Sequence, residues 1–278
     1  MALTWRTCLK TSRPGISNKF PNPTRSTCTI TASASAKTHF YTHSLCPYAH
    51  RVALALAEKG VKHETTEIDL SRKPSWYYSI NPNGLVPSLQ VDGQVVVESL
   101  DICRFVDDHF DGPNLMPEAG STNFNLANEL ISNCDRFASA GLRYCAGTSR
   151  YWGIGPAGKD DKSSRASYQL ALDELSAAME VHGGPYLAGN SVTLADLVYL
   201  PFAIRFDLVL REVRSFDMRT SGSASGAYSP VGVWLSNMEQ RSAFVDASPE
   251  NDKLQRALLK HMSFDFFDYS THFASTLA

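Results

Sequence analysis

The order of strand and helix patterns along residues 38–110 constrains the fold of this chain more than any other sequence feature. Short alternating stretches typical of strands are separated by helical stretches, in the order strand, helix, strand, helix, strand, strand, helix. Gly60 marks the end of the first helix, and Asp92-Gly93 predicts a tight hairpin turn between the last two strands. Beyond about residue 120 the strand patterns disappear.

The rest of the chain is helical by its pattern. Helical periodicity marks the stretches around 123–146, 164–181, 193–214 and 231–240. Stretches that contain Gly and Ser, at 147–164 and 215–230, interrupt them and are predicted to be loops. We therefore predict an α+β protein with a thioredoxin-like domain of βαβαββα order over residues 37–112, followed by an all-helical domain over residues 113–278.

Residues 1–36 differ in composition from the rest of the chain. They hold five Lys or Arg and twelve Ser or Thr, and the first acidic residue in the sequence is Glu58. This composition predicts a disordered transit peptide, and the excess of Ser and Thr over Arg favours the chloroplast over the mitochondrion. The alternative is a disordered tail that carries no address, in which case the protein would be cytoplasmic.

Charge, hydropathy and cysteine spacing argue against several kinds of protein. The formal net charge of −2 lacks the basic excess typical of nucleic-acid binding. No apolar run approaches the roughly 18 residues of a membrane-spanning helix. The six cysteines are irregularly spaced without any CxxC, which argues against a disulfide framework and a zinc finger. We therefore expect no nucleic-acid partner, no membrane span and no bound metal.

Cys46 and Pro47 stand where the first predicted strand gives way to the first helix. Proline suits the first helical position because its missing N–H would have no partner there. Cys46 would then cap the helix, with its sulfur facing the free amides of Tyr48 and Ala49 and the positive end of the helix dipole. Such settings lower a cysteine pKa from about 8.5 to roughly 3.5–7.5, which predicts a nucleophile. The alternative is a small apolar residue buried beneath the strand end.

Four segments together resemble the glutathione S-transferase superfamily. They are CPYA at 46–49, KPSWYYSINPNGLVPSL at 73–89, ESLDICRFVDDHFDGPNL at 98–115 and YLAGNSVTLADLVYLPF at 186–202. The resemblance extends from about Lys37 to about Val245. Within the superfamily, the chain is most similar to the cysteine-type classes, first the plant lambda class and then the omega class. The insertion at 220–230 departs from the lambda pattern.

The resemblance implies that glutathione is the co-substrate, and it implies which residues hold it. Glu98 would pair with the α-ammonium of the γ-glutamyl end, and the helix start at Ser99 would bind its carboxylate. Val86-Pro87 resembles the family's cis-proline turn, which presents the backbone of Val86 to the cysteinyl part. Lys73 matches the lysine that meets the glycyl carboxylate, with a solvated surface lysine as the alternative.

CPYA lacks the second cysteine of a CxxC motif, so Cys46 cannot resolve a mixed disulfide within its own motif. An external thiol must do so, and glutathione is the thiol that the resemblance supplies. We therefore expect a glutathione-dependent thiol transferase or reductase that deglutathionylates its substrate through a mixed disulfide on Cys46. The implied substrates are small glutathione adducts, oxidised phenolics such as flavonoids, or other small aromatic or disulfide compounds.

Other functions stay open on sequence grounds. The chain could be a carrier that binds glutathione and a flavonoid with little turnover, a conjugating glutathione transferase, or a dehydroascorbate reductase. A hydroxyl residue would be expected in place of Cys46 in a conjugating enzyme, because it would activate the sulfur of glutathione. Turnover separates an enzyme from a carrier.

Several side chains are assigned structural roles. Three cysteines within helical patterns are predicted to be packing residues: Cys103, Cys134 and Cys145. Thr193 and Asp196 form a capping-box pattern, so Asp196 is interpreted as a helix cap rather than a catalytic acid. His50, one turn beyond Cys46, could polarise the thiol, but exposure at the surface is the expectation.

The resemblance to the lambda class implies a monomer, or at most a weak dimer. The helix that begins at Ser99 is expected to present charged side chains to solvent rather than to a twofold partner. The residues concerned are Asp101, Arg104, Asp107 and Asp108.

Overall fold

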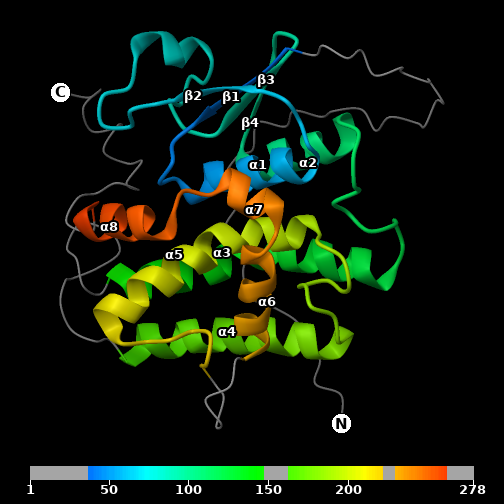
Figure 1. Cartoon of the computed structure of the whole chain (residues 1–278), viewed down its shortest axis with the longest axis vertical. Helices are drawn as coiled ribbons and strands as arrows, with labels where there is room; N and C mark the ends of the chain where they lie inside the picture. The colour runs from blue at the N-terminus through cyan, green and yellow to red at the C-terminus, as the bar shows by residue number, and fades with distance from the viewer. Residues whose placement is uncertain (1–36, 147–161, 222–228, 262–278) are drawn as a thin grey trace, which may run out of the picture. The chain divides into compact units, whose positions relative to one another are not determined.

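The computed structural model describes residues 37–146, 162–221 and 229–261 (Figure 1). The predicted transit peptide at 1–36 lies outside the described residues, as do 147–161 and 222–228 of the predicted loops. All the described residues fall within one compact unit. The predicted domain boundaries, 37–112 and 113–278, therefore stay a proposal for dividing that unit into two parts.

The first part is a four-stranded sheet with helices packed on it. Its elements are β1 (Thr38–Thr42), α1 (Pro47–Glu58), β2 (Glu64–Glu67), the 3-10 helix η1 (Ser75–Ser79), β3 (Ser88–Val91), β4 (Gln94–Val97) and α2 (Ser99–His109). The sheet order is β2-β1-β3-β4, with β1 and β2 parallel and the other pairs antiparallel. The predicted βαβαββα order is confirmed, including the Asp92-Gly93 hairpin, where both residues have positive φ angles of 48° and 88°.

The second part contains only helices among its described elements. They are α3 (Thr122–Ala146), α4 (Lys162–His182), α5 (Leu194–Arg214), α6 (Pro230–Glu239), α7 (Ser242–Ala247) and α8 (Asn251–His261). The first four match the predicted helical stretches, whereas α7 and α8 were not predicted. In Figure 1, α1 and α2 lie between the sheet and the other helices, and α1 packs against both α5 and α7.

The start of α5 confirms the capping-box prediction. The Asp196 carboxylate is fully buried and accepts hydrogen bonds from the backbone N–H of Thr193 at 2.8 Å and of Leu187 at 2.8 Å. It also accepts from the hydroxyl of Thr193 and the indole N–H of Trp234. Burial raises the pKa of Asp196 while these bonds lower it. Asp196 therefore ties α5 to the preceding loop and to α6, which is a structural role.

One of the charges predicted to face solvent does not do so. Asp107 is only 8% exposed at its side chain and pairs with Lys59 at 3.1 Å. It also accepts the backbone N–H groups of Leu115 at 2.7 Å and Met116 at 2.9 Å. The prediction for Asp107 is therefore wrong, because its carboxylate holds the chain that leads from α2 into the helical part. None of the described helices is both long and apolar enough to cross a membrane.

Candidate active site

Cys46 is the N-cap of α1, as predicted, and Pro47 occupies its first turn. The Ala49 backbone N–H donates to the sulfur at 3.5 Å, and the thiol donates to the carbonyl of Val86 at 3.8 Å. The residue is only 1% exposed. The sulfur therefore lies at the positive end of α1, between that helix and the segment that leads into β3.

The strand register brings the other predicted residues to the same edge of the sheet. Ser88 pairs with Tyr41 of β1 on one side and with Val97 of β4 on the other. The next pair along is therefore Pro87 and Glu98, at the end where β1 leads toward Cys46. The Val86-Pro87 peptide bond is cis, which confirms that prediction.

Glu98 and Ser99 connect β4 to α2. Glu98 is exposed, has a φ of 68°, and makes no side-chain capping bond. A side chain is disfavoured at such a φ, and residues of this kind cluster at functional sites. Ser99 is buried, and its hydroxyl accepts a hydrogen bond from Arg51 at 3.3 Å. A buried guanidinium thus stands beside the start of α2.

Lys73 lies between β2 and η1 and is half-buried. Burial lowers its pKa, and in the described part of the chain no carboxylate pairs with it. Its stem passes close to Gly84, where an added Cβ would lie 3.3 Å from the Lys73 Cδ. Gly84 is two residues before Val86, so the structure brings Lys73 near the cis-proline turn.

Two buried arginines behind Cys46 were missed by the sequence analysis. Arg51 lies over the rings of Tyr48 and Phe202, at 5.1 and 4.8 Å from their centres. Arg205 of α5 donates to the backbone carbonyl of Leu45. The available signal was an arginine inside an otherwise apolar helical run, since a charge in such a place is buried only with specific partners.

His50 is buried, so the expectation that it is exposed is wrong. Its Nδ1 lies 3.1 Å from Arg205 Nη1, and its Nε2 lies 2.8 Å from Ser248 Oγ. Burial, with a smaller contribution from Arg205, lowers the pKa of His50 well below its usual value. Because arginine only donates, Nδ1 accepts, and the neutral ring carries its proton on Nε2 and donates it to Ser248. Both ring nitrogens of His50 therefore take part in hydrogen bonds with a structural role.

The other described cysteines are buried and protonated. Burial raises the pKa of the Cys103 thiol to about 12 and also raises the pKa values of Cys134 and Cys145. The prediction that these three are packing residues agrees with their place in the core. Over the residues that the structure describes, no group of three His, Cys, Asp or Glu side chains is placed to hold a metal ion.

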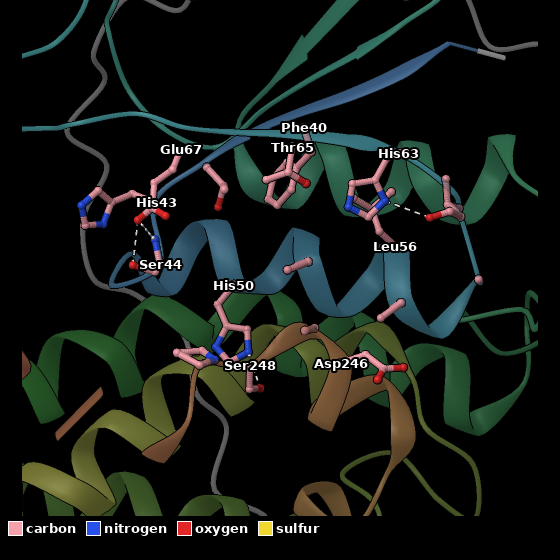
Figure 2. Close-up of a pocket in the computed structure, with 17 residues that line it drawn as sticks. Phe40, His43, Ser44, His50, Leu56, His63, Thr65, Glu67, Asp246 and Ser248 are labelled. Carbon is pink, nitrogen blue, oxygen red and sulfur yellow. Dashed lines mark hydrogen bonds between the residues drawn. The ribbon is translucent and has the colours of Figure 1, made fainter. Parts of the chain in front are cut away.

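A cavity of about 510 Å³ lies beside α1, β2 and the connection between α7 and α8 (Figure 2). His43, Ser44 and His50 line it, together with Glu67 and apolar side chains of α1. Cys46 is not among the lining residues. This cavity therefore adjoins the loop that carries the thiol but does not contain the thiol.

Comparisons with known proteins agree on one family. The family models described as "Glutathione S-transferase, N-terminal domain" and "Glutathione S-transferase, C-terminal domain" match residues 45–109 and 163–235. Glutathione S-transferase L2, chloroplastic, of Arabidopsis thaliana is 30% identical over 223 residues, which cover 78% of this chain and 68% of that protein.

The fold of this chain resembles those of several solved structures. Glutathione transferase Omega 2C from Trametes versicolor has a TM-score of 0.67 at 22% identity, covering 82% of this chain and 99% of that one. A trimeric glutathione transferase from Leishmania has a TM-score of 0.68 at 21% identity, covering 81% of this chain and 48% of that one.

Proposed function

This chain belongs to the glutathione S-transferase family, and from that premise we propose that it is a glutathione-dependent thiol transferase with Cys46 as its nucleophile. The observation that carries the proposal is the place of Cys46 at the start of α1, where the Ala49 amide donates to its sulfur. A thiolate accepts that bond better than a thiol does, and the helix dipole favours the negative charge.

The proposed cycle has two exchange steps. In the first, the Cys46 thiolate attacks the glutathione sulfur of a glutathionylated substrate, which forms a Cys46–glutathione disulfide and releases the substrate thiolate to take up a proton. In the second, the thiolate of a second glutathione attacks the glutathione sulfur of that disulfide. Oxidised glutathione then leaves, and the Cys46 thiolate is regenerated.

Glutathione is proposed to resolve the disulfide because none of the other described cysteines is suited to do so. Among the described cysteines, Cys103, Cys134 and Cys145 are all buried within helices, and their raised pKa values keep them protonated. The thiolate is the nucleophile, so thiols that are held in the protonated form are poor nucleophiles. This pattern favours a one-cysteine cycle with an external thiol.

The proposed glutathione site follows the edge of the sheet beside Cys46. The backbone of Val86, at the cis peptide bond to Pro87, would pair with the cysteinyl part of glutathione. The start of α2 at Ser99 would bind the γ-glutamyl carboxylate, with Glu98 on the α-ammonium. Lys73 would meet the glycyl carboxylate. The proposal gains support from the unpaired state of Lys73 and from the register of β3 and β4.

The second substrate is proposed to be a small aromatic or disulfide compound that carries glutathione. A chloroplast location is proposed from the composition of residues 1–36, and the Arabidopsis relative is described as chloroplastic. A fluorescent fusion of the full chain should accumulate in chloroplasts, whereas a fusion that begins at residue 37 should stay in the cytoplasm.

The test uses intact mass spectrometry after incubation with oxidised glutathione, followed by turnover of a glutathionylated small molecule. The wild-type chain should gain a glutathione on Cys46, identified on the Cys46 peptide, and should lose it again to a reducing thiol. Cys46→Ser should lose this modification and thiol transfer, while Cys103→Ala, which replaces a matched buried cysteine, should keep both properties. A full rate of thiol transfer in Cys46→Ser would refute the proposal.

The same measurements separate the alternative functions. A chain that binds glutathione but turns over neither a glutathionylated compound nor an electrophile would be a carrier. A chain that conjugates glutathione to an aryl halide faster than it exchanges thiols would be a conjugating transferase. Reduction of dehydroascorbate, without thiol transfer, would identify a dehydroascorbate reductase.

A further inference from the structure

A buried arginine of the helical part holds the loop that precedes Cys46. Arg205 of α5 is only 4% exposed. Its Nε donates to the carbonyl of Leu45 at 3.1 Å, and its Nη2 donates to the carbonyl of Ser44 at 3.3 Å. These carbonyls belong to the two residues immediately before Cys46. The position of the sulfur at the N-cap therefore depends on a side chain 160 positions from Leu45 in the sequence.

The remaining hydrogen bonds of Arg205 also go to neutral acceptors. Its Nη1 donates to the carbonyl of Pro201 at 2.8 Å and to Nδ1 of His50 at 3.1 Å. Within the ranges that the structure describes, no carboxylate forms an ion pair with Arg205. A buried charge is costly unless an opposite charge compensates it.

Cys46 is the group that can provide the compensating charge. Burial lowers the pKa of Arg205 to about 10, and the interaction with the charge of Cys46 acts in the opposite direction. The attraction is mutual, so a fixed guanidinium favours the thiolate form of Cys46 as much as the thiolate favours the guanidinium. Neutral His50 does not compete for this charge.

We propose that Arg205 is a positioning residue for Cys46, which fixes the Ser44–Leu45 loop and supplies the buried positive charge that stabilises the thiolate. The predicted effect on turnover rests on the proposed function. The predicted effect on the ionisation of the Cys46 thiol does not, because it can be measured without glutathione. The reactive centre is thus shared between the sheet-containing part, which supplies the sulfur, and the helical part, which supplies the charge.

The experiment measures the rate of alkylation of Cys46 by iodoacetamide in the full chain between pH 5 and pH 9. Mass spectrometry of the Cys46 peptide separates it from the other cysteines. In Arg205→Met the midpoint of the pH profile should move upward by about one unit, with a fall of about tenfold in rate below the midpoint. Arg205→Lys keeps a positive charge, so its midpoint should stay closer to that of the wild type.

Turnover provides the second readout. Lysine cannot reproduce the planar fork that reaches both loop carbonyls, so Arg205→Lys should lower kcat for thiol transfer while KM for glutathione changes little. Arg219→Met is the matched control, because Arg219 is a partly buried arginine that pairs with Asp207 and Glu239 rather than with the loop. It should lose stability and keep the wild-type alkylation profile.

The outcomes are distinguishable from those that test the proposed function. A folded Arg205→Met with an unchanged alkylation profile would overturn the inference, even if the wild type is an active thiol transferase. A shifted profile would support it even if no thiol transfer is found in the wild type. If Arg205→Met does not fold, Arg205→Lys serves as the test. An Arg205→Lys variant with both the turnover and the alkylation profile of the wild type would overturn the inference.

Discussion

At the scale of single residues, the proposed glutathione site contains charged groups for which the described residues provide no oppositely charged partner. Lys73 is half-buried, and this burial lowers its pKa. No carboxylate among the described residues pairs with it. Glu98 is exposed at an unfavourable backbone conformation. Groups kept in this state without a structural partner are suited to bind a charged ligand.

Replacing Lys73 should weaken glutathione binding more than it slows chemistry. A charged hydrogen bond is worth roughly 1.5–3 kcal/mol, so Lys73→Met should raise KM for glutathione by about tenfold or more and leave kcat nearly unchanged. Steady-state kinetics with varied glutathione measures this. Lys62→Met, which removes an exposed lysine nearby in the sequence, is the control. An unchanged KM in Lys73→Met would exclude Lys73 from the site.

Replacing Glu98 with glycine should weaken glutathione binding but make the protein more stable. Glycine tolerates the φ of 68°, so Glu98→Gly should raise the free energy of unfolding by about 1 kcal/mol and also raise KM for glutathione. Glu98→Gln keeps the backbone conformation and loses the charge, so it should raise KM without raising stability. Urea unfolding and kinetics on both variants measure the two effects. A less stable Glu98→Gly would contradict the argument from the backbone.

At the scale of elements, the junction between α1, α5 and the segment after α7 depends on a neutral histidine. His50 of α1 accepts from Arg205 of α5 and donates to Ser248 beyond α7. His43, Glu67 and Asp246 line the cavity beside α1 that His50 also lines (Figure 2). Protonating His50 would place a second positive charge next to the buried Arg205, which the interior disfavours.

Acidification should therefore weaken this junction. The pKa of His50 is lowered in the folded protein, whereas an unfolded histidine titrates near 6.5, so the unfolded state takes up the proton first. The stabilising contribution is present above about pH 6.5 and is lost as pH falls, with a slope of at most about 1.4 kcal/mol per pH unit.

The measurement is urea unfolding from pH 7.5 to pH 5.5. His50→Gln should be less stable than the wild type at pH 7.5 and should lose less stability on acidification. His63→Gln, in which an exposed histidine is replaced, should keep the wild-type slope. Equal slopes in the wild type and His50→Gln would show that His50 does not control the acid sensitivity.

At the scale of the whole molecule, the monomer proposal rests on exposed charge along α2. Asp101, Arg104 and Asp108 are exposed, whereas Asp107 is withdrawn into its pair with Lys59 and no longer supports the argument. A stable twofold dimer typically needs about 800 Å² of self-complementary surface on each partner, and exposed charges do not favour such a patch.

Light scattering at micromolar concentration should give the mass of a single chain. The Leishmania transferase that shares the fold is described as trimeric, so assembly differs among proteins of this shape and must be measured. A stable mass of two or three chains, independent of dilution, would contradict the proposal.

The sequence alone predicted features whose partners lie within a few residues of one another. Cys46 and Pro47 begin α1, Asp92-Gly93 turns the hairpin, and Thr193 pairs with Asp196 at the start of α5. Each depends on backbone groups that a neighbouring residue satisfies, so the local pattern is sufficient to identify it. The family resemblance added the cis-proline turn and the residues proposed to hold glutathione.

Only the tertiary structure decided which charges are buried and what they contact. Arg205 reaches Leu45 across 160 positions, and His50 reaches Ser248 across 198. Asp107 turns inward to Lys59 although its helical position suggested solvent. Such pairs depend on how α1 packs against α5 and the segment after α7, and the periodicity of a single helix carries no information about its partner on another helix. The order of helices and strands therefore follows from local sequence patterns, whereas the surroundings of the proposed nucleophile arise from packing between helices that are distant in the sequence.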